Sequence, residues 1–96
     1  MKLQLVDTAA MSEKGIPEYM QDAIIAYYEV GRPPGDFLCA VINNDLRGAV
    51  SHADDTNKLH LHSYMLWFYN HAPAGTWGFE GAVDKWVKEF KHEQAD

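Results

Sequence analysis

The sequence predicts an all-α fold, a compact bundle of four to five short helices. Apolar side chains recur three and four residues apart in several segments, which is the periodicity of amphipathic helices. Proline and glycine lie between these segments, where they end one helix and precede the next. Hydrophobic residues make up 47% of the 96 residues and charged residues 23%, which is usual for a globular protein. We therefore expect one domain with a modest core.

The first predicted helix runs from about Pro17 to Val30. Proline fits the first helical position, and Gly31 supplies the C-terminal stop. Apolar residues recur between them at helical spacing: Tyr19, Met20, Ala23, Ile24, Tyr27 and Tyr28. Before this helix, a short β-like run is followed by Ala-rich and polar residues. This mixture predicts an N-terminal arm over residues 1–15, flexible or paired with a partner.

Two short helices are predicted next. The stretch 32–36 contains two prolines and cannot continue a helix. The apolar block 37–42 predicts a buried helix that starts near Pro34 or Gly35. Asn44 is a good N-cap for a helix over residues 45–51, so we expect a break at Asn43 and Asn44.

The stretch Asn57 to Asn70 predicts a helix that is apolar nearly all round, preceded by capping residues at 54–56. Such a helix is usually central in a bundle or shared between protomers. Period-two alternation at its start leaves a strand over 59–69 as the alternative. The last helix, from about Gly78 or Phe79 to Lys91, has a clean amphipathic stripe. Residues 16–92 thus form one helical domain, followed by a tail at 93–96.

Charge and composition restrict the partners. The formal net charge is −6, and no basic run offers a stripe for phosphates, so we expect no duplex nucleic acid. No segment approaches the roughly 20 apolar residues that span a bilayer, so we expect no membrane partner. The single cysteine, Cys39, fits a reducing compartment and favours the cytoplasm. The aromatic share of 12% is a large apolar load for so short a chain and favours a homo-oligomer.

No group of residues predicts catalysis. Potential metal ligands are densest at His52, Asp54, Asp55, His60 and His62. Two of the histidines lie two apart, on different faces of a helix, and no spacing converges on one ion. Cys39 lies in an apolar block, where a thiol is usually inert. We therefore predict no metal, no cofactor and no enzyme; a small metal-dependent hydrolase using His52, Asp54 or His62 is the weaker alternative.

The pattern of motifs resembles a family of small phage and prophage proteins. The resemblance covers about Pro17 to Trp86 and is carried by Gly31-Arg32-Pro33-Pro34-Gly35-Asp36-Phe37-Leu38, Asn44-Asp45-Leu46, Ala53-Asp54-Asp55-Thr56-Asn57, Tyr69-Asn70, Pro73, Trp77-Gly78 and Trp86. It brings no catalytic residues with it. It implies a compact accessory protein that acts in the cytoplasm of an infected bacterium.

Two functional hypotheses follow. The first is a non-catalytic counter-defence protein that sequesters a small nucleotide-derived immune signal. Arg32, Asn43, Asn44 and Arg47 would supply the polar contacts, and Trp77 or Tyr28 would supply a stacking face. The alternative is a protein–protein inhibitor or adaptor, which would bind a host defence protein directly through an exposed aromatic and acidic patch.

Overall fold

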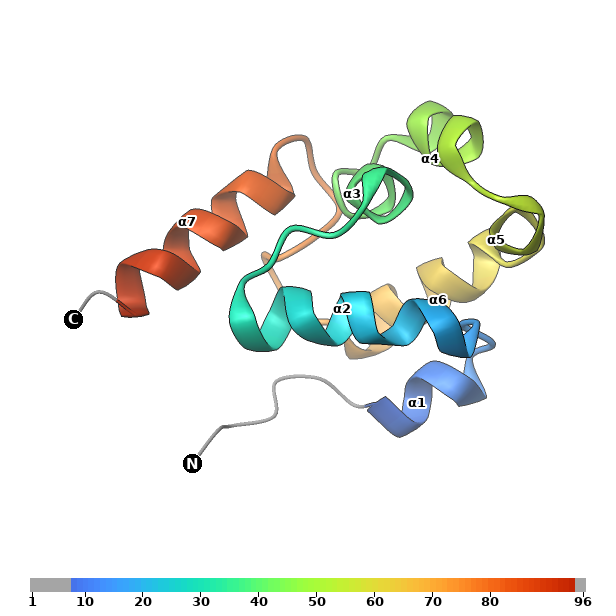
Figure 1. The fold of residues 1–96 in the computed structure, drawn as a ribbon, viewed down its shortest axis with the longest axis horizontal. Coiled ribbons are helices and arrows are strands. Elements are labelled where there is room, and N and C mark those ends of the chain that lie inside the picture. The colour runs from blue at the N-terminus through green and yellow to red at the C-terminus, as the bar shows by residue number, and fades with distance from the viewer. Residues whose placement is uncertain (1–7, 95–96) are drawn as a thin grey trace.

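The computed structural model describes residues 8–94, and within this range it contains seven helices and no strand (Figure 1). The all-α prediction is confirmed, and the strand alternative for 59–69 is wrong. The expected number of helices was too low, because one helix lies in the predicted arm and another breaks into two. The helices are α1 (Thr8–Glu13), α2 (Glu18–Val30), α3 (Asp36–Ile42), α4 (Leu46–His52), α5 (Asp55–Leu59), α6 (Leu61–His71) and α7 (Ala82–Gln94).

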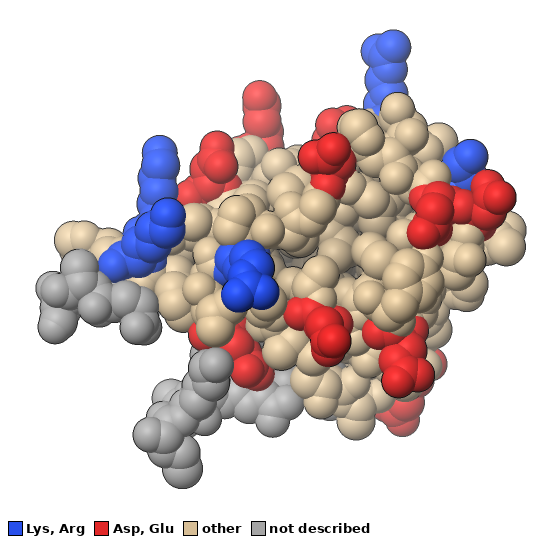
Figure 2. All heavy atoms as spheres, viewed as in Figure 1, with Lys and Arg blue, Asp and Glu red and all other residues tan. Residues whose placement is uncertain are grey.

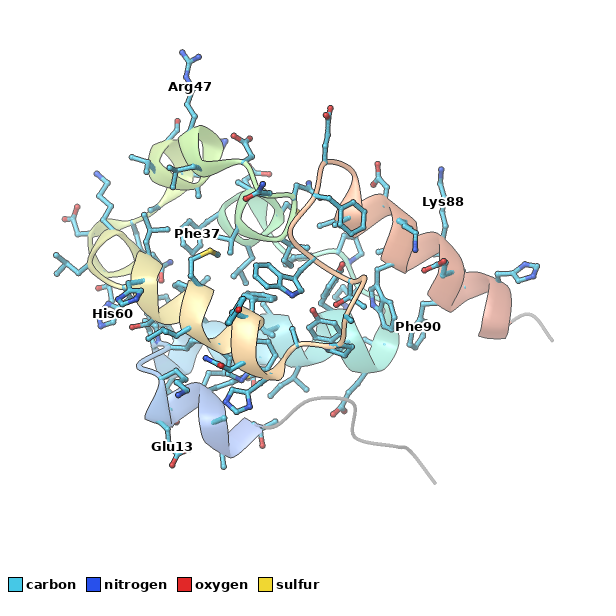
Figure 3. All side chains as sticks on the ribbon, turned by 180° about the vertical axis from the view of Figure 1, so that it is seen from behind. Glu13, Phe37, Arg47, His60, Lys88 and Phe90 are labelled. Carbon is cyan, nitrogen blue, oxygen red and sulfur yellow. The ribbon has the colours of Figure 1, made fainter. Side chains whose placement is uncertain are left out.

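The helix α2 has the bounds that its sequence predicts. Pro17 precedes it, and Gly31 ends it in the left-handed conformation with φ 67°, donating its N–H to the carbonyl oxygen of Ala26. The helix lies in front of α6 in Figure 1 and behind it in Figure 3, the view from the opposite side. The rings of Tyr28 and Trp67 meet between the two helices, 6.3 Å apart. The core therefore lies between α2 and α6.

Aromatic side chains dominate this core, and their polar atoms have partners. The Tyr27 hydroxyl donates to the carbonyl oxygen of Thr76 at 3.0 Å, and the Tyr28 hydroxyl lies 2.8 Å from Oγ1 of the same residue. The Tyr64 hydroxyl donates to Oδ1 of Asn57 at 2.6 Å. Each large ring is thus buried without an unpaired hydroxyl. The largest fully buried side chains are Trp67, Tyr27, Tyr28, Tyr64, Phe68, Met11, Ile24, Leu38 and Ile42.

The predicted N-terminal arm needs correction for residues 8–15. These residues form α1 and the turn after it, and α1 packs on α2 and α6. Met11 is fully buried, and its carbonyl oxygen accepts the N–H of Ile16 at 2.9 Å. Burial of Met11 and Ala10 therefore stabilises a helix that local sequence patterns did not predict. Residues 1–7, the rest of the predicted arm, lie outside the described residues.

Two helix starts differ from the prediction. Asn44 ends α3 in a left-handed conformation with φ 61°, and Asp45 caps α4 in its place, its Oδ1 accepting the N–H of Gly48 at 2.9 Å. Asp54, one of the capping residues predicted at 54–56, caps α5, and its Oδ1 accepts the N–H of Asn57 at 2.7 Å. At His60, with φ −117° and ψ 15°, the predicted long helix divides into α5 and α6.

The last helix, α7, starts at Ala82, later than predicted. Gly78 and Gly81 have φ of 89° and 83°, which no helix contains, so residues 78–81 form turns. The helix extends to one side of the molecule (Figure 1) and continues to Gln94, so the predicted tail at 93–96 is wrong for residues 93 and 94. Residues 95 and 96 lie outside the described part. The Trp86 Nε1 donates to the carbonyl oxygen of Tyr27 at 2.6 Å and joins α7 to α2.

Candidate functional site

The residues predicted to contact a nucleotide-derived ligand do not form one site. Tyr28, a proposed stacking residue, has no exposed surface, and burial raises the pKa of its phenol to about 12. Trp77 is half-buried, with its ring 5.5 Å from that of Phe68. Asn43 is half-buried, and its Oδ1 accepts the N–H of Val83 at 2.9 Å. These three side chains support the fold.

The other three predicted residues are exposed but separate. Arg32 lines a hollow of about 280 Å³ beside Asp22 and the two prolines after α2. Asn44 lines a different hollow, between α4 and α6. Arg47 lines neither, and its side chain extends from α4 away from the rest of the molecule (Figure 3). The structure therefore distributes these polar groups over the surface.

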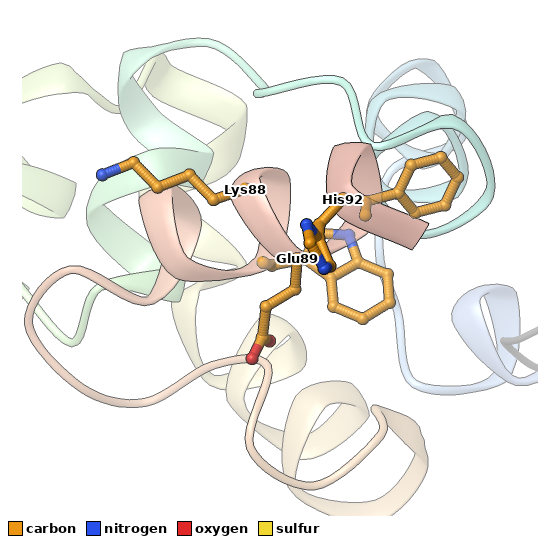
Figure 4. A pocket seen from close by; sticks show the side chains of 5 residues that line it. Lys88, Glu89 and His92 are labelled. Carbon is orange, nitrogen blue, oxygen red and sulfur yellow. The ribbon is translucent and has the colours of Figure 1, made fainter. Parts of the chain in front are cut away.

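A hollow of about 570 Å³ beside α7 has the volume of a small-molecule site. Its lining residues in the described part of the chain all come from α7: Trp86, Lys88, Glu89, Phe90 and His92. A ligand site needs a few polar groups that converge. Here Lys88, Glu89 and His92 point in different directions from the helix (Figure 4). The hollow has the size of a ligand site without a convergent set of polar contacts.

A smaller groove lies between α4 and α6, and Ala40 and Val41 of α3 also line it. Its volume is about 130 Å³, close to the roughly 150 Å³ of a cavity that holds benzene, and far below the roughly 300 Å³ at which small-molecule sites begin. It therefore has the size of one apolar side chain. Aliphatic groups form most of its wall, and the lining residues are Ala40, Val41, Asn44, Asp45, Leu46, Ala49, Leu61, His62 and Met65.

Exposed apolar side chains adjoin this groove on two sides. On α4, Leu46 is 71% exposed and Val50 is 48% exposed; the groove together with these two residues is called the α4 edge below. On α6, four exposed residues share the outer face and are called the α6 stripe: His62, Met65, Leu66 and Tyr69. Apolar surface of this kind marks an interaction site more often than scattered single residues do.

The groups that could react or bind metal give little support for chemistry. Among the side chains that the structure describes, no three from His, Cys, Asp or Glu gather in a way that could hold a metal ion. The Cys39 Sγ donates to the carbonyl oxygen of Pro34 at 3.2 Å, and burial, with Asp36 and Asp84 nearby, raises the pKa of the thiol. A raised thiol pKa means less of the reactive thiolate at neutral pH.

Asp54 has its pKa lowered mainly by the Tyr19 hydroxyl, which donates to Oδ2 at 2.7 Å, and also by the N–H of Asn57. Both hydrogen bonds favour the ionised carboxylate. Because the same carboxylate caps α5, the shift reflects a structural role. The carboxylate joins the start of α2 to the start of α5.

Acidic groups do not gather in one place on the face shown in Figure 2. Asp and Glu side chains there are spread among uncharged surface, and Lys and Arg lie between them. None of the helices in the described range is long and apolar enough to cross a membrane. No protein-family model, no curated protein and no solved structure matches the chain.

Sequence reasoning missed the α4 edge. The available signal was Leu46 and Val50, four residues apart and therefore neighbours on one face of a short helix. The α6 stripe was partly foreseen, because a helix that is apolar nearly all round was expected to be central or shared. The structure adds which face is left exposed.

Proposed function

We propose that this chain is a non-catalytic protein-binding module, an inhibitor or adaptor that holds its partner at the α4 edge. The observation that carries the proposal is the groove between α4 and α6, which has the volume of one side chain and an exposed apolar rim. A groove of this kind takes an apolar anchor residue from another protein. The function is therefore binding through shape and apolar contact.

The groove supports binding in the way that interface centres usually do. Full burial of one Leu, Phe or Met side chain is worth about 1.5–3 kcal/mol, and such anchors in fitted pockets dominate binding energies. Polar groups of Asn44, Asp45 and His62 line the same groove as the aliphatic side chains and offer hydrogen bonds at its rim. An anchor in the groove with polar contacts around it is the arrangement we propose.

A bacterial host protein is the partner that we propose. The resemblance to phage accessory proteins favours a component of host defence. The net charge of −6 favours a partner surface with basic groups around the apolar anchor, because complementary charge accelerates and orients association. Contact would take place in the bacterial cytoplasm.

Sequestration of a nucleotide-derived signal has less support. Tyr28 and Asn43 are engaged in the fold, and Arg32 and Asn44 line different hollows. Of these two hollows, that of Arg32 is the larger at about 280 Å³, and Asp22 lies in its wall, where its carboxylate would repel a phosphate. A metal-dependent hydrolase likewise lacks a set of gathered ligands in residues 8–94.

The test compares two exposed leucines. Leu46→Asp places a charge at the rim of the groove, and Leu59→Asp makes the same change on α5 at a residue that is 84% exposed and outside the groove lining. We expect the wild type and Leu59→Asp to retain the same host protein from bacterial lysate. We expect Leu46→Asp to bind that purified protein at least about tenfold more weakly, a change of about 1.4 kcal/mol. Titration calorimetry measures the affinity, and circular dichroism checks that both variants fold.

Two outcomes would contradict the proposal. In the first, Leu46→Asp binds the retained protein as tightly as the wild type does. In the second, the wild type retains no host protein and instead releases a stoichiometric nucleotide when it is denatured. The second result would favour sequestration of a nucleotide-derived ligand as the function.

A further inference from the structure

The α6 stripe borders the groove: His62 and Met65 line it, whereas Leu66 and Tyr69 lie outside its lining and are not used by the proposed function. His62, Leu66 and Tyr69 lie four and three residues apart, so they share one face of α6, and Met65 lies beside them. Tyr69 is 80% exposed, and Met65 and Leu66 are 37% and 36% exposed. The opposite face of the helix buries Tyr64, Trp67 and Phe68 completely. The inner face thus belongs to the core, and the outer face has no partner within the described chain.

Charge distinguishes between the occupants that could cover this stripe. The helix α6 contains no Asp, Glu, Lys or Arg, although such residues make up 23% of the chain. A basic partner would find no carboxylate on α6 with which to pair. Two copies of a chain of net charge −6 repel each other least when they meet on an uncharged surface. The uncharged stripe therefore favours a second copy of the chain.

The order of residues along the stripe is self-complementary. His62 lies near the start of α6, Met65 and Leu66 lie in the middle, and Tyr69 lies near the end. If two α6 helices pack antiparallel about a two-fold axis at Leu66, the two Leu66 side chains meet at the axis. His62 of each copy then lies close to Tyr69 of the other, where imidazole and phenol can hydrogen-bond. The antiparallel arrangement also places opposite ends of the helix dipoles side by side.

We propose that the α6 stripe binds a second copy of this chain, in an antiparallel pair of α6 helices about a two-fold axis at Leu66. The interface is isologous, as in most symmetric dimers, because each copy contributes the same residues. Because His62 and Met65 also line the groove, pairing covers part of the α4 edge in each copy, and a second copy competes with the proposed partner for these two residues. The dimer itself does not depend on that binding function.

The first test is the oligomeric state measured by sedimentation equilibrium. We expect the wild type to be a dimer at micromolar concentration. Leu66→Asp places two carboxylates at the axis, and Tyr69→Asp places charge at each end of the stripe, so each should weaken the dimer at least about a hundredfold. Val30→Asp, at a residue of α2 that is 44% exposed, is the matched control and should stay dimeric. A monomeric wild type at 100 μM, or dimers in both stripe variants as stable as in the wild type, would overturn the proposal.

The second test distinguishes an antiparallel pair from a parallel one by disulfide formation. In a Cys39→Ser background, Leu66→Cys should form a cross-linked dimer on oxidation, since the two sulfurs meet at the axis. Tyr69→Cys should not, because three residues from the axis the two cysteines lie about 9 Å apart along the helices at a rise of about 1.5 Å per residue. Equal cross-linking by both variants would contradict the antiparallel arrangement. Failure here leaves the effect of Leu46→Asp on host-protein binding unchanged, so the two proposals can fail separately.

Discussion

Thr76 joins the loop between α6 and α7 to the helix α2. Its carbonyl oxygen accepts the Tyr27 hydroxyl at 3.0 Å, and its Oγ1 lies 2.8 Å from the Tyr28 hydroxyl. The same Oγ1 donates to the carbonyl oxygen of Pro73 at 2.6 Å. The loop between α6 and α7 is thus fixed to α2. Because Thr76 is 48 residues from Tyr28, no local pattern in the sequence could have identified these partners.

Asn43 caps the start of α7 from a distant part of the chain. Its Oδ1 accepts the N–H of Val83, one of the N–H groups that have no partner within the helix. We expect Asn43→Ala to lower the free energy of unfolding by about 1–3 kcal/mol, because it leaves this N–H without an acceptor. Asn43→Asp keeps an acceptor oxygen and should lower it less. Urea unfolding measures both, and equal losses in the two variants would exclude this role.

At the scale of helices, the sequence predicted those helix ends that a proline or a glycine determines. Pro17 and Gly31 bound α2 as expected, because one fixes φ near the helical value and the other adopts a left-handed φ without strain. The break at His60 has no such signal, since neither residue type is near it. The helix α1 was missed because it is only six residues long and depends on burying Met11. Ends that depend on tertiary contacts could not be predicted.

The end of α2 also contacts α7 closely. A Cβ at Gly31 would lie 2.6 Å from Cδ1 of Phe90, and the φ of 67° is unfavourable for other residues by about 1–2 kcal/mol. We expect Gly31→Ala to lower the free energy of unfolding through both effects. A Phe90→Ala background removes the two closest ring atoms but keeps the Cβ of residue 90 at 3.0 Å, and the φ strain remains, so the loss should be smaller by at least about 0.5 kcal/mol. A double-mutant cycle by urea unfolding measures this coupling, and strict additivity would contradict it.

At the scale of the whole molecule, three buried tyrosines link stability to alkaline pH. Burial raises the pKa of Tyr28 to about 12, and burial raises the pKa of Tyr27 and Tyr64 further still. Below the ordinary value of 10, folded and unfolded chains both keep the phenol protons, so stability is unaffected. Above it, the unfolded chain releases protons that the folded chain retains. Stability should therefore fall as pH rises from 10 to 12.

We expect each of these tyrosines to lower the free energy of unfolding by about 1.4 kcal/mol per pH unit in this range. Tyr28→Phe removes one titrating group, so the slope against pH should be shallower by about that amount, whatever its effect at neutral pH. Urea unfolding between pH 9 and 11.5 measures both slopes. Parallel slopes in the two proteins would mean that the Tyr28 phenol ionises alike in the folded and unfolded chains.

The all-α fold class followed from periodicity, whereas most of the candidate site did not. Tyr19 and Tyr28 occupy the same predicted helix at apolar spacing, yet one is 60% exposed and the other is fully buried. Only the packing of α6 against α2 determines which of the two tyrosines is buried. The groove likewise requires residues of α3, α4 and α6 to come together, and nothing in any one of these segments encodes that placement. A surface made by several helices cannot be predicted before their packing is known.

The absence of formal charge on α6 has a consequence for how the proposed dimer should respond to ionic strength. Interfaces held by ion pairs loosen in salt, because counter-ions screen the attraction. Across the α6 stripe there is no such attraction to screen, while the general repulsion between two chains of net charge −6 is screened like any other. Added salt should thus strengthen the proposed pair of α6 helices.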